Sequence, residues 1–164
     1  MLVAPAVYFF DVVLAVHVMC VVLAFGVTFA YPIVIPWLKA NHPSAMPTVH
    51  RTQLRIGRRL ITPFMVLILL TGIYLASDRH LWSQTWVTVP LVIIVVIFGF
   101  GGAFFTPRER KLAELADHDL GPERNGTFSP EYEKLFGSLM KVGALNGALI
   151  LIAIFFMVAR PFPS

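Results

Sequence analysis

His17 is the residue whose type and position most suggest chemistry. It lies within residues 12–35, a run without formal charge, where a polar side chain is costly and needs a partner or a role. An imidazole there can ligate a haem iron or relay a proton. It can equally remain neutral and bond to a hydroxyl on a neighbouring helix. Counting residues along the apolar runs places Thr71 and Tyr74 at a comparable depth, so we expect them to line a pocket around His17.

Asp11 is a second polar residue beside the first apolar run. A carboxylate there can accept a proton, but it also lies close enough to the end of the run to reach water. The helical angle separates Asp11 from His17 by about 120°. The two side chains are therefore not predicted to form a pair.

Small residues recur in the third and fourth apolar runs. Gly99 and Gly102 lie in the third run, and Gly143, Asn146 and Gly147 form a small-and-polar seam in the fourth, with the two glycines spaced as GxxxG. Small residues allow the backbones of membrane helices to approach closely. We therefore predict that these five residues are helix-packing surfaces.

Several common sites are absent from the sequence. Cys20 is the single cysteine, and there is no HxxxH or CxxC pattern, no glycine-rich phosphate loop and no nucleophile elbow. A metal centre built on standard spacings is therefore not predicted. The same absences leave no particular enzymatic reaction favoured.

The elements that position these residues follow from composition. The chain has 164 residues, of which 57% are hydrophobic and 13% charged, with a mean hydropathy of +0.77. Soluble domains are about 45–50% apolar and about 25% charged, so a soluble or disordered protein is excluded. Four uncharged runs each approach the roughly 20 residues that cross a bilayer. We predict one all-α transmembrane domain over residues 1–164, an antiparallel four-helix bundle with spans at about 7–35, 60–77, 85–106 and 136–159.

Orientation follows from the basic residues. All lysines and arginines except Arg79 and Arg160 lie in or beside the two long connections, 38–58 and 107–134. Because basic loops stay in the cytoplasm, we predict that both connections are cytoplasmic and both termini outside, in a multi-pass protein of the cell inner (plasma) membrane. The net charge of +4 is then explained by the membrane orientation of the basic connections. No nucleic-acid partner is therefore expected.

The sequence also indicates where two further helical segments begin. Residues 108–119 read as a short charged helix, and Ser129 followed by Pro130 reads as the capped start of the fourth helix. The first run has no Lys or Arg before it and is longer than the apolar region of a signal peptide. We therefore expect the first helix to remain in the mature protein.

Three stretches carry a family resemblance: residues 17–26 with His17-Val18-Met19, residues 59–75 from Arg59-Leu60 to Tyr74-Leu75, and the closing residues 157–161. They resemble an uncharacterised bacterial family of four-helix integral membrane proteins related to the CopD-like superfamily. More distantly, the chain is similar to the HemJ-type protoporphyrinogen oxidases. The second resemblance implies that His17 ligates haem. The third span, 86–105, lacks the second His or Lys expected of those proteins, which implies a five-coordinate haem or one shared across a homodimer.

Three functions remain open at this stage. The first is a haem-binding or redox-associated membrane protein that uses His17. The second is a non-enzymatic assembly partner or accessory subunit, packed through its glycine surfaces against a homodimer or complex partner in the lipid bilayer. The third is a small-solute or metal transporter, which the lack of paired intramembrane charges disfavours. A visible absorption spectrum distinguishes the first from the other two.

Overall fold

The computed structural model describes residues 8–121 and 126–161. Every regular element in these residues is helical, as the composition predicts. The elements are α1 (Phe9–Asn41), η1 (Pro43–Ala45), α2 (Met46–Ile56), η2 (Gly57–Ile61), α3 (Thr62–Asp78), α4 (Thr85–Phe100), η3 (Gly101–Phe105), α5 (Thr106–Asp119) and α6 (Pro130–Ala159).

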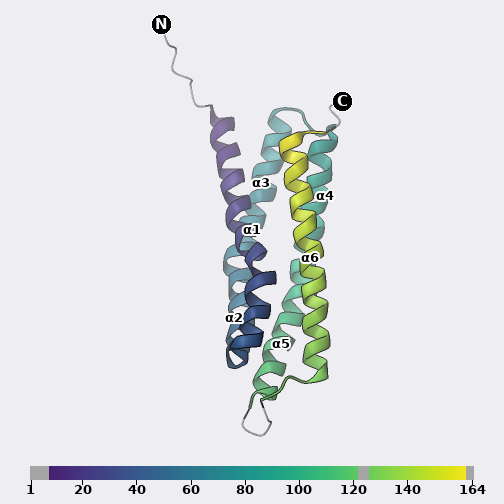
Figure 1. Cartoon of the computed structure of the whole chain (residues 1–164). Coiled ribbons are helices and arrows are strands. Elements are labelled where there is room, and N and C mark those ends of the chain that lie inside the picture. The colour runs from purple at the N-terminus through teal and green to yellow at the C-terminus, as the bar shows by residue number, and fades with distance from the viewer. Residues whose placement is uncertain (1–7, 122–125, 162–164) are drawn as a thin grey trace.

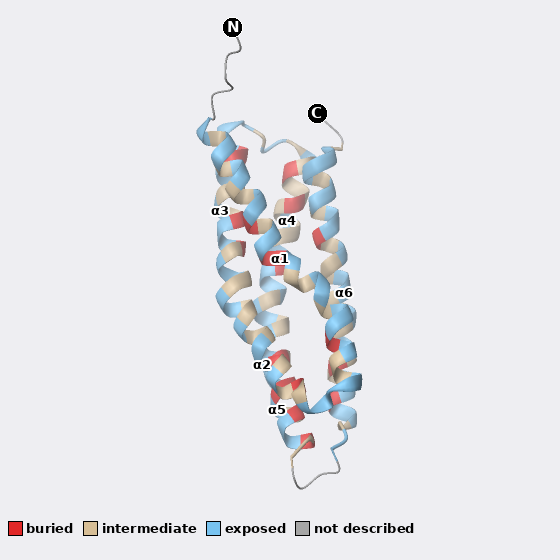
Figure 2. Cartoon of the chain, turned by 60° about the vertical axis from the view of Figure 1, so that its left-hand side comes forward, coloured by how far each residue is buried: buried red, intermediate tan, exposed pale blue. Residues whose placement is uncertain are grey.

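Four helical stretches of the described chain are long and apolar enough to cross a membrane: Phe9–Asn41, Pro43–Asp78, Thr85–Asp119 and Pro130–Ala159. Their apolar side chains point outward as well as inward, and Val158 is 79% exposed. Figure 2 shows exposed residues along the outer faces of all the long helices. A helix that is apolar all round suits a lipid environment, so the prediction of four membrane-spanning helices is confirmed.

The long helices run alternately up and down (Figure 1). The start of α1, the end of α6 and the α3–α4 connection lie together, and we call this the terminal end. At the other end, which we call the basic end, lie α2, α5, the last turns of α1 and the first turns of α6. Along the bundle, α1 packs on α3 and α4 packs on α6, while α2 packs on α5.

The two long connections are mostly helical. Residues 38–58 contain the end of α1 and all of α2, and residues 107–134 contain most of α5 and the start of α6. These helices bury a core of their own, separate from the core among the spans, formed by Ile35, Met46, Leu112, Ala116, Tyr132, Phe136 and Leu139. The basic end is therefore a packed continuation of the membrane bundle.

The same π-helical turn, which is wider than an α-helical one, occurs in two helices where the spans meet the basic end. The sequence Gly-x-x-x-x-Thr-Pro occurs at 57–63 and again at 101–107. In the first, the Thr62 hydroxyl donates to the Gly57 carbonyl at 2.9 Å, and the second turn makes the same bond at the same length. Pro63 has no N–H to donate, and a π-type turn precedes it. Both helices thus pass this level without a break.

The start of α6 agrees with its sequence signal. Ser129 is the N-cap, and its hydroxyl oxygen accepts a hydrogen bond from the Tyr132 backbone N–H at 3.3 Å. Pro130 occupies the first helical position, where no N–H is needed. This local capping starts α6 within the basic end, well before its apolar stretch.

Candidate functional site

His17 on α1 is held by a hydrogen bond to α3. Its Nδ1 lies 2.8 Å from Oγ1 of Thr71, and that hydroxyl lies 2.6 Å from the Leu67 carbonyl oxygen. A threonine hydroxyl has one hydrogen, which the short contact assigns to the Leu67 carbonyl. The imidazole must then donate its Nδ1–H to Thr71. In this tautomer Nε2 carries the lone pair.

Gly72 makes room for this ring. A Cβ atom at Gly72 would lie 3.3 Å from Cε1 of His17 and 3.8 Å from its Nδ1. The first distance is tighter than an ordinary van der Waals contact. The missing side chain therefore lets the imidazole approach the α3 backbone closely, with its Nδ1 hydrogen-bonded to Thr71.

A cavity of about 840 Å³ opens beside His17 among α1, α3, α4 and α6. This volume falls within the range of small-molecule and cofactor sites. Its walls are almost wholly apolar, with Val21, Ile68 and Ile94 as examples. Among the described residues that line it, His17 is the sole imidazole.

The lining of the cavity extends to the terminal end, where it includes two arginines, Arg79 and Arg160. The Arg79 guanidinium lies 4.3 Å from the centre of the Phe10 ring, and the Arg160 guanidinium lies 4.8 Å from the Trp86 ring. All four of these residues line the cavity. The two cationic side chains that line the cavity therefore both lie at its terminal end.

Tyr74 packs against the start of α1. Its ring packs edge-on against Phe9, with the centroids 5.6 Å apart, and its hydroxyl is 3.5 Å from an Asp78 carboxylate oxygen. The structure thus brings Thr71 to His17, as the depth count indicates, and turns Tyr74 toward the start of α1. A pocket-lining role for either residue stays a prediction.

Asp11 has a structural partner. Its carboxylate accepts a hydrogen bond from the Tyr8 backbone N–H at 3.1 Å. Tyr8 is the N-cap of α1 and Asp11 the third helical residue, where an acidic side chain satisfies an otherwise unpaired N–H and suits the helix dipole. Capping therefore accounts for this carboxylate at the edge of the first span.

The glycine surfaces are mostly open. A Cβ at Gly99, Gly102 or Gly143 would meet no atom of another described element within 4 Å, and one at Gly147 would lie 3.8 Å from the Phe29 ring. Asn146 is half-buried. The helices of this chain therefore do not meet closely at the first three glycines, and their packing against another chain stays a prediction.

A second polar cluster lies in the basic end. His50 on α2 bonds through Nδ1 to a Glu109 carboxylate oxygen at 2.8 Å and through Nε2 to the Tyr132 hydroxyl at 2.9 Å. All three are buried, with exposed fractions of 1%, 8% and 0%. The cluster joins α2, α5 and α6. Sequence reasoning missed it because its members lie 59 and 82 positions from His50.

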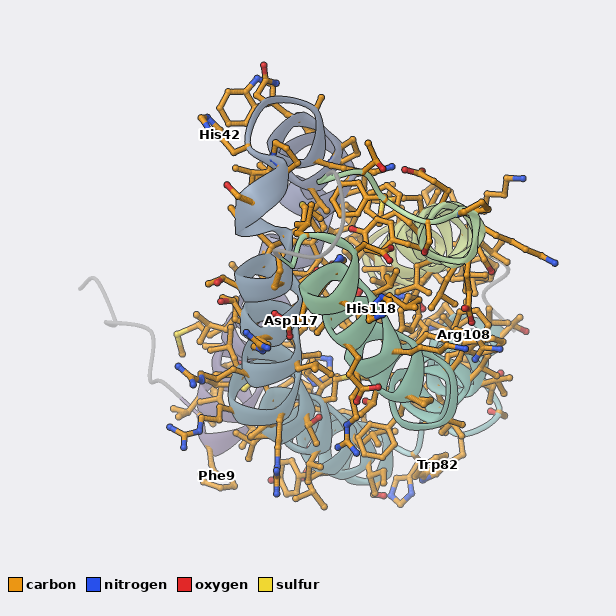
Figure 3. All side chains as sticks on the ribbon, turned by 90° about the horizontal axis from the view of Figure 1, so that it is seen from below. Phe9, His42, Trp82, Arg108, Asp117 and His118 are labelled. Atoms are coloured by element: carbon orange, nitrogen blue, oxygen red, sulfur yellow. The ribbon has the colours of Figure 1, made fainter. Side chains whose placement is uncertain are left out.

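Ion pairs between neighbouring helices lie around this cluster. Arg51 on α2 pairs with Asp117 on α5, and Lys39 on α1 pairs with Glu133 on α6 at 2.5 Å. Seen from this end, Asp117 lies near the middle of the view and Arg108 toward the α6 side (Figure 3). Pairs of exposed side chains add little stability, whereas His50, Glu109 and Tyr132 link three helices through buried groups.

Four membrane-spanning helices around an apolar cavity define an integral membrane protein with a multi-pass arrangement. Residues 11–161 match the model of a family described as "Predicted integral membrane protein (DUF2269)", and the chain belongs to this family. No curated protein and no solved structure gives a significant match.

Proposed function

We propose that the protein binds haem through Nε2 of His17. The observation that carries the proposal is the bond from His17 Nδ1 to Thr71. Histidines that ligate metals usually donate their other ring N–H to a fixed acceptor, which sets the tautomer and the ring orientation. Thr71 supplies that acceptor here, and the lone pair of Nε2 is left for iron.

The surroundings of His17 suit a large planar ligand. The cavity has a volume of about 840 Å³ and apolar walls, which match the apolar body of a porphyrin and exclude water from its faces. When bound, haem would supply electron-transfer or gas-ligand chemistry. His17 would hold the iron, Thr71 would hold His17, and the walls would set the polarity around the group. The resemblance to HemJ-type oxidases points to the same residue.

The coordination number follows from the residues that line the cavity. His17 is the sole imidazole among those described. A haem held by one chain would therefore be five-coordinate, with a position open to an added ligand such as carbon monoxide. A haem shared between two copies would instead be held by two His17 side chains.

The test is titration of the detergent-purified protein with haem, followed by the visible spectrum. The wild type should show a stoichiometric Soret band, and His17→Ala should weaken binding at least tenfold. His42→Ala is the matched control, because His42 packs on Trp37 at the other end of the chain's first helix. Equal binding by wild type and His17→Ala, or no band in either, would overturn the proposal.

We also propose that the basic end faces the cytoplasm of a plasma membrane. The positions of the lysines and arginines support this orientation. A single cysteine introduced at Arg55 in a Cys20→Ser background should resist membrane-impermeant thiol reagents in intact cells and react after lysis. Labelling of Arg55→Cys in intact cells would reverse the assignment.

A second candidate is an accessory role in a membrane complex or homodimer. The open backbone at Gly99, Gly102 and Gly143 favours it, since such surfaces accept another helix closely. Gly143→Leu should then reduce the recovery of the larger species in size-exclusion chromatography with light scattering. A monomer in both forms would exclude self-association through this surface.

A further inference from the structure

Arg79 and Arg160 are the only arginines or lysines among the described residues lining the cavity, whose walls are otherwise almost wholly apolar. They lie at the terminal end of the cavity, just after different helices, and each guanidinium lies over an aromatic ring, Phe10 for Arg79 and Trp86 for Arg160. Stacking fixes the plane of a guanidinium while leaving its N–H donors free at the edge. Two such groups present donors suited to carboxylates.

The charges of the two arginines are only partly compensated within the described chain. Arg79 Nε lies 3.6 Å from an Asp78 carboxylate oxygen, a loose pair at a surface position. No described carboxylate lies within ion-pair distance of Arg160. Each arginine also follows the C-terminus of a helix, α3 or α6, where a cation is favourable. That placement explains why arginine is tolerated there, but not why both line one cavity.

The distance between His17 and the two arginines limits which ligand can contact all three residues. Phe10, on which Arg79 stacks, precedes His17 by seven positions on α1, which corresponds to about 10 Å along the helix. A ligand that uses all of these residues would have an apolar body, a group that binds an imidazole, and anionic groups about 10 Å from it. Haem has this pattern, since its two propionates leave one edge of the macrocycle.

We propose that Arg79 and Arg160 bind the two propionate carboxylates of haem at the terminal end of the cavity. This inference rests on the proposed function, because it takes haem as the ligand of His17. Binding in this orientation directs the charged edge toward water and the apolar edge toward the core among the spans.

The test compares three porphyrins: haem, haem dimethyl ester, and iron-free protoporphyrin IX. Esterification removes the carboxylate charge and keeps the iron, whereas protoporphyrin keeps the carboxylates and lacks the iron. Wild type should bind haem at least tenfold more tightly than the diester. Arg79→Gln with Arg160→Gln should abolish that preference, and Arg59→Gln, an exposed arginine of η2 outside the cavity, should retain it.

A further pair of variants separates charge from folding. Arg79→Lys with Arg160→Lys keeps both charges and should retain most of the preference for haem over the diester. If this pair and the glutamine pair lose the preference equally while eluting as folded protein, charge recognition is refuted.

The two proposals fail in different ways. If wild type binds haem and the diester equally, yet loses both in His17→Ala, the arginine assignment is wrong and haem ligation stands. If His17→Ala binds haem as wild type does, and wild type binds protoporphyrin IX as tightly as haem while still preferring haem to the diester, the ligation is wrong and the arginine site stands. If no porphyrin binds, both are wrong.

Discussion

The buried cluster of His50, Glu109 and Tyr132 gives the most sharply defined stability prediction. Tyr132→Phe deletes one oxygen and keeps the ring, which stacks on Phe128 with centroids 4.2 Å apart. The change leaves Nε2 of His50 without its 2.9 Å partner at a site sealed from water. An unsatisfied buried polar group costs about 1–3 kcal/mol. The unfolding equilibrium should therefore shift by roughly 5- to 150-fold.

The assay is reversible unfolding in detergent micelles, followed by circular dichroism as a denaturing detergent is added. Tyr74→Phe is the matched control, because it deletes the same hydroxyl where the side chain is exposed and the bond to Asp78 is a long 3.5 Å. It should change the free energy of unfolding by less than about 0.5 kcal/mol. Equal effects of the two substitutions would refute the claim that burial sets the cost.

A double-mutant cycle isolates the bond itself. In a His50→Phe background no ring nitrogen remains, so Tyr132→Phe should cost much less there than in the wild type. A coupling energy of about 0.5–3 kcal/mol is expected for groups in direct contact. Strict additivity of the two substitutions would show that the hydroxyl acts through some other contact.

Three further outcomes follow from local geometry. Thr71→Val should lower haem affinity about 10- to 100-fold in the titration, because it removes the acceptor that orients His17; unchanged affinity would exclude that role. Gly72→Ala should also weaken haem binding, since its Cβ would lie 3.3 Å from the imidazole, whereas Gly26→Ala, with open space around it, should not. Ser129→Ala should lower the free energy of unfolding by about 1 kcal/mol through loss of the α6 cap, and an unchanged unfolding midpoint would contradict this.

The parts of the structure that sequence could predict depend on composition or on near neighbours. The four spans follow from uncharged runs, and the Ser129 cap involves residues only three positions apart. Thr71 could be placed beside His17 because membrane helices share one rise per residue and begin near common boundaries. Depth alone does not give rotation about the helix axis. Tyr74, at a similar depth, faces Phe9 instead.

The remaining features arise from tertiary packing that no spacing encodes. His50 meets Glu109 and Tyr132 only because α2, α5 and α6 converge beyond the spans. The cavity depends on how four helices are arranged around His17 at the terminal end. The Gly-x-x-x-x-Thr-Pro pattern is visible at both 57–63 and 101–107, yet a proline by itself predicts a bend and not a wide turn.

The unbroken passage of two helices through those wide turns fixes the geometry of the protein beyond the lipid. Stretches of 36 and 35 residues measure roughly 50 Å at the rise of an α-helix, against a hydrocarbon thickness of about 30 Å. Some 20 Å of stiff rod must project from one face of the bilayer. In these two stretches of the described chain, continuous helix therefore connects the spans to the basic end and holds it beyond the headgroups.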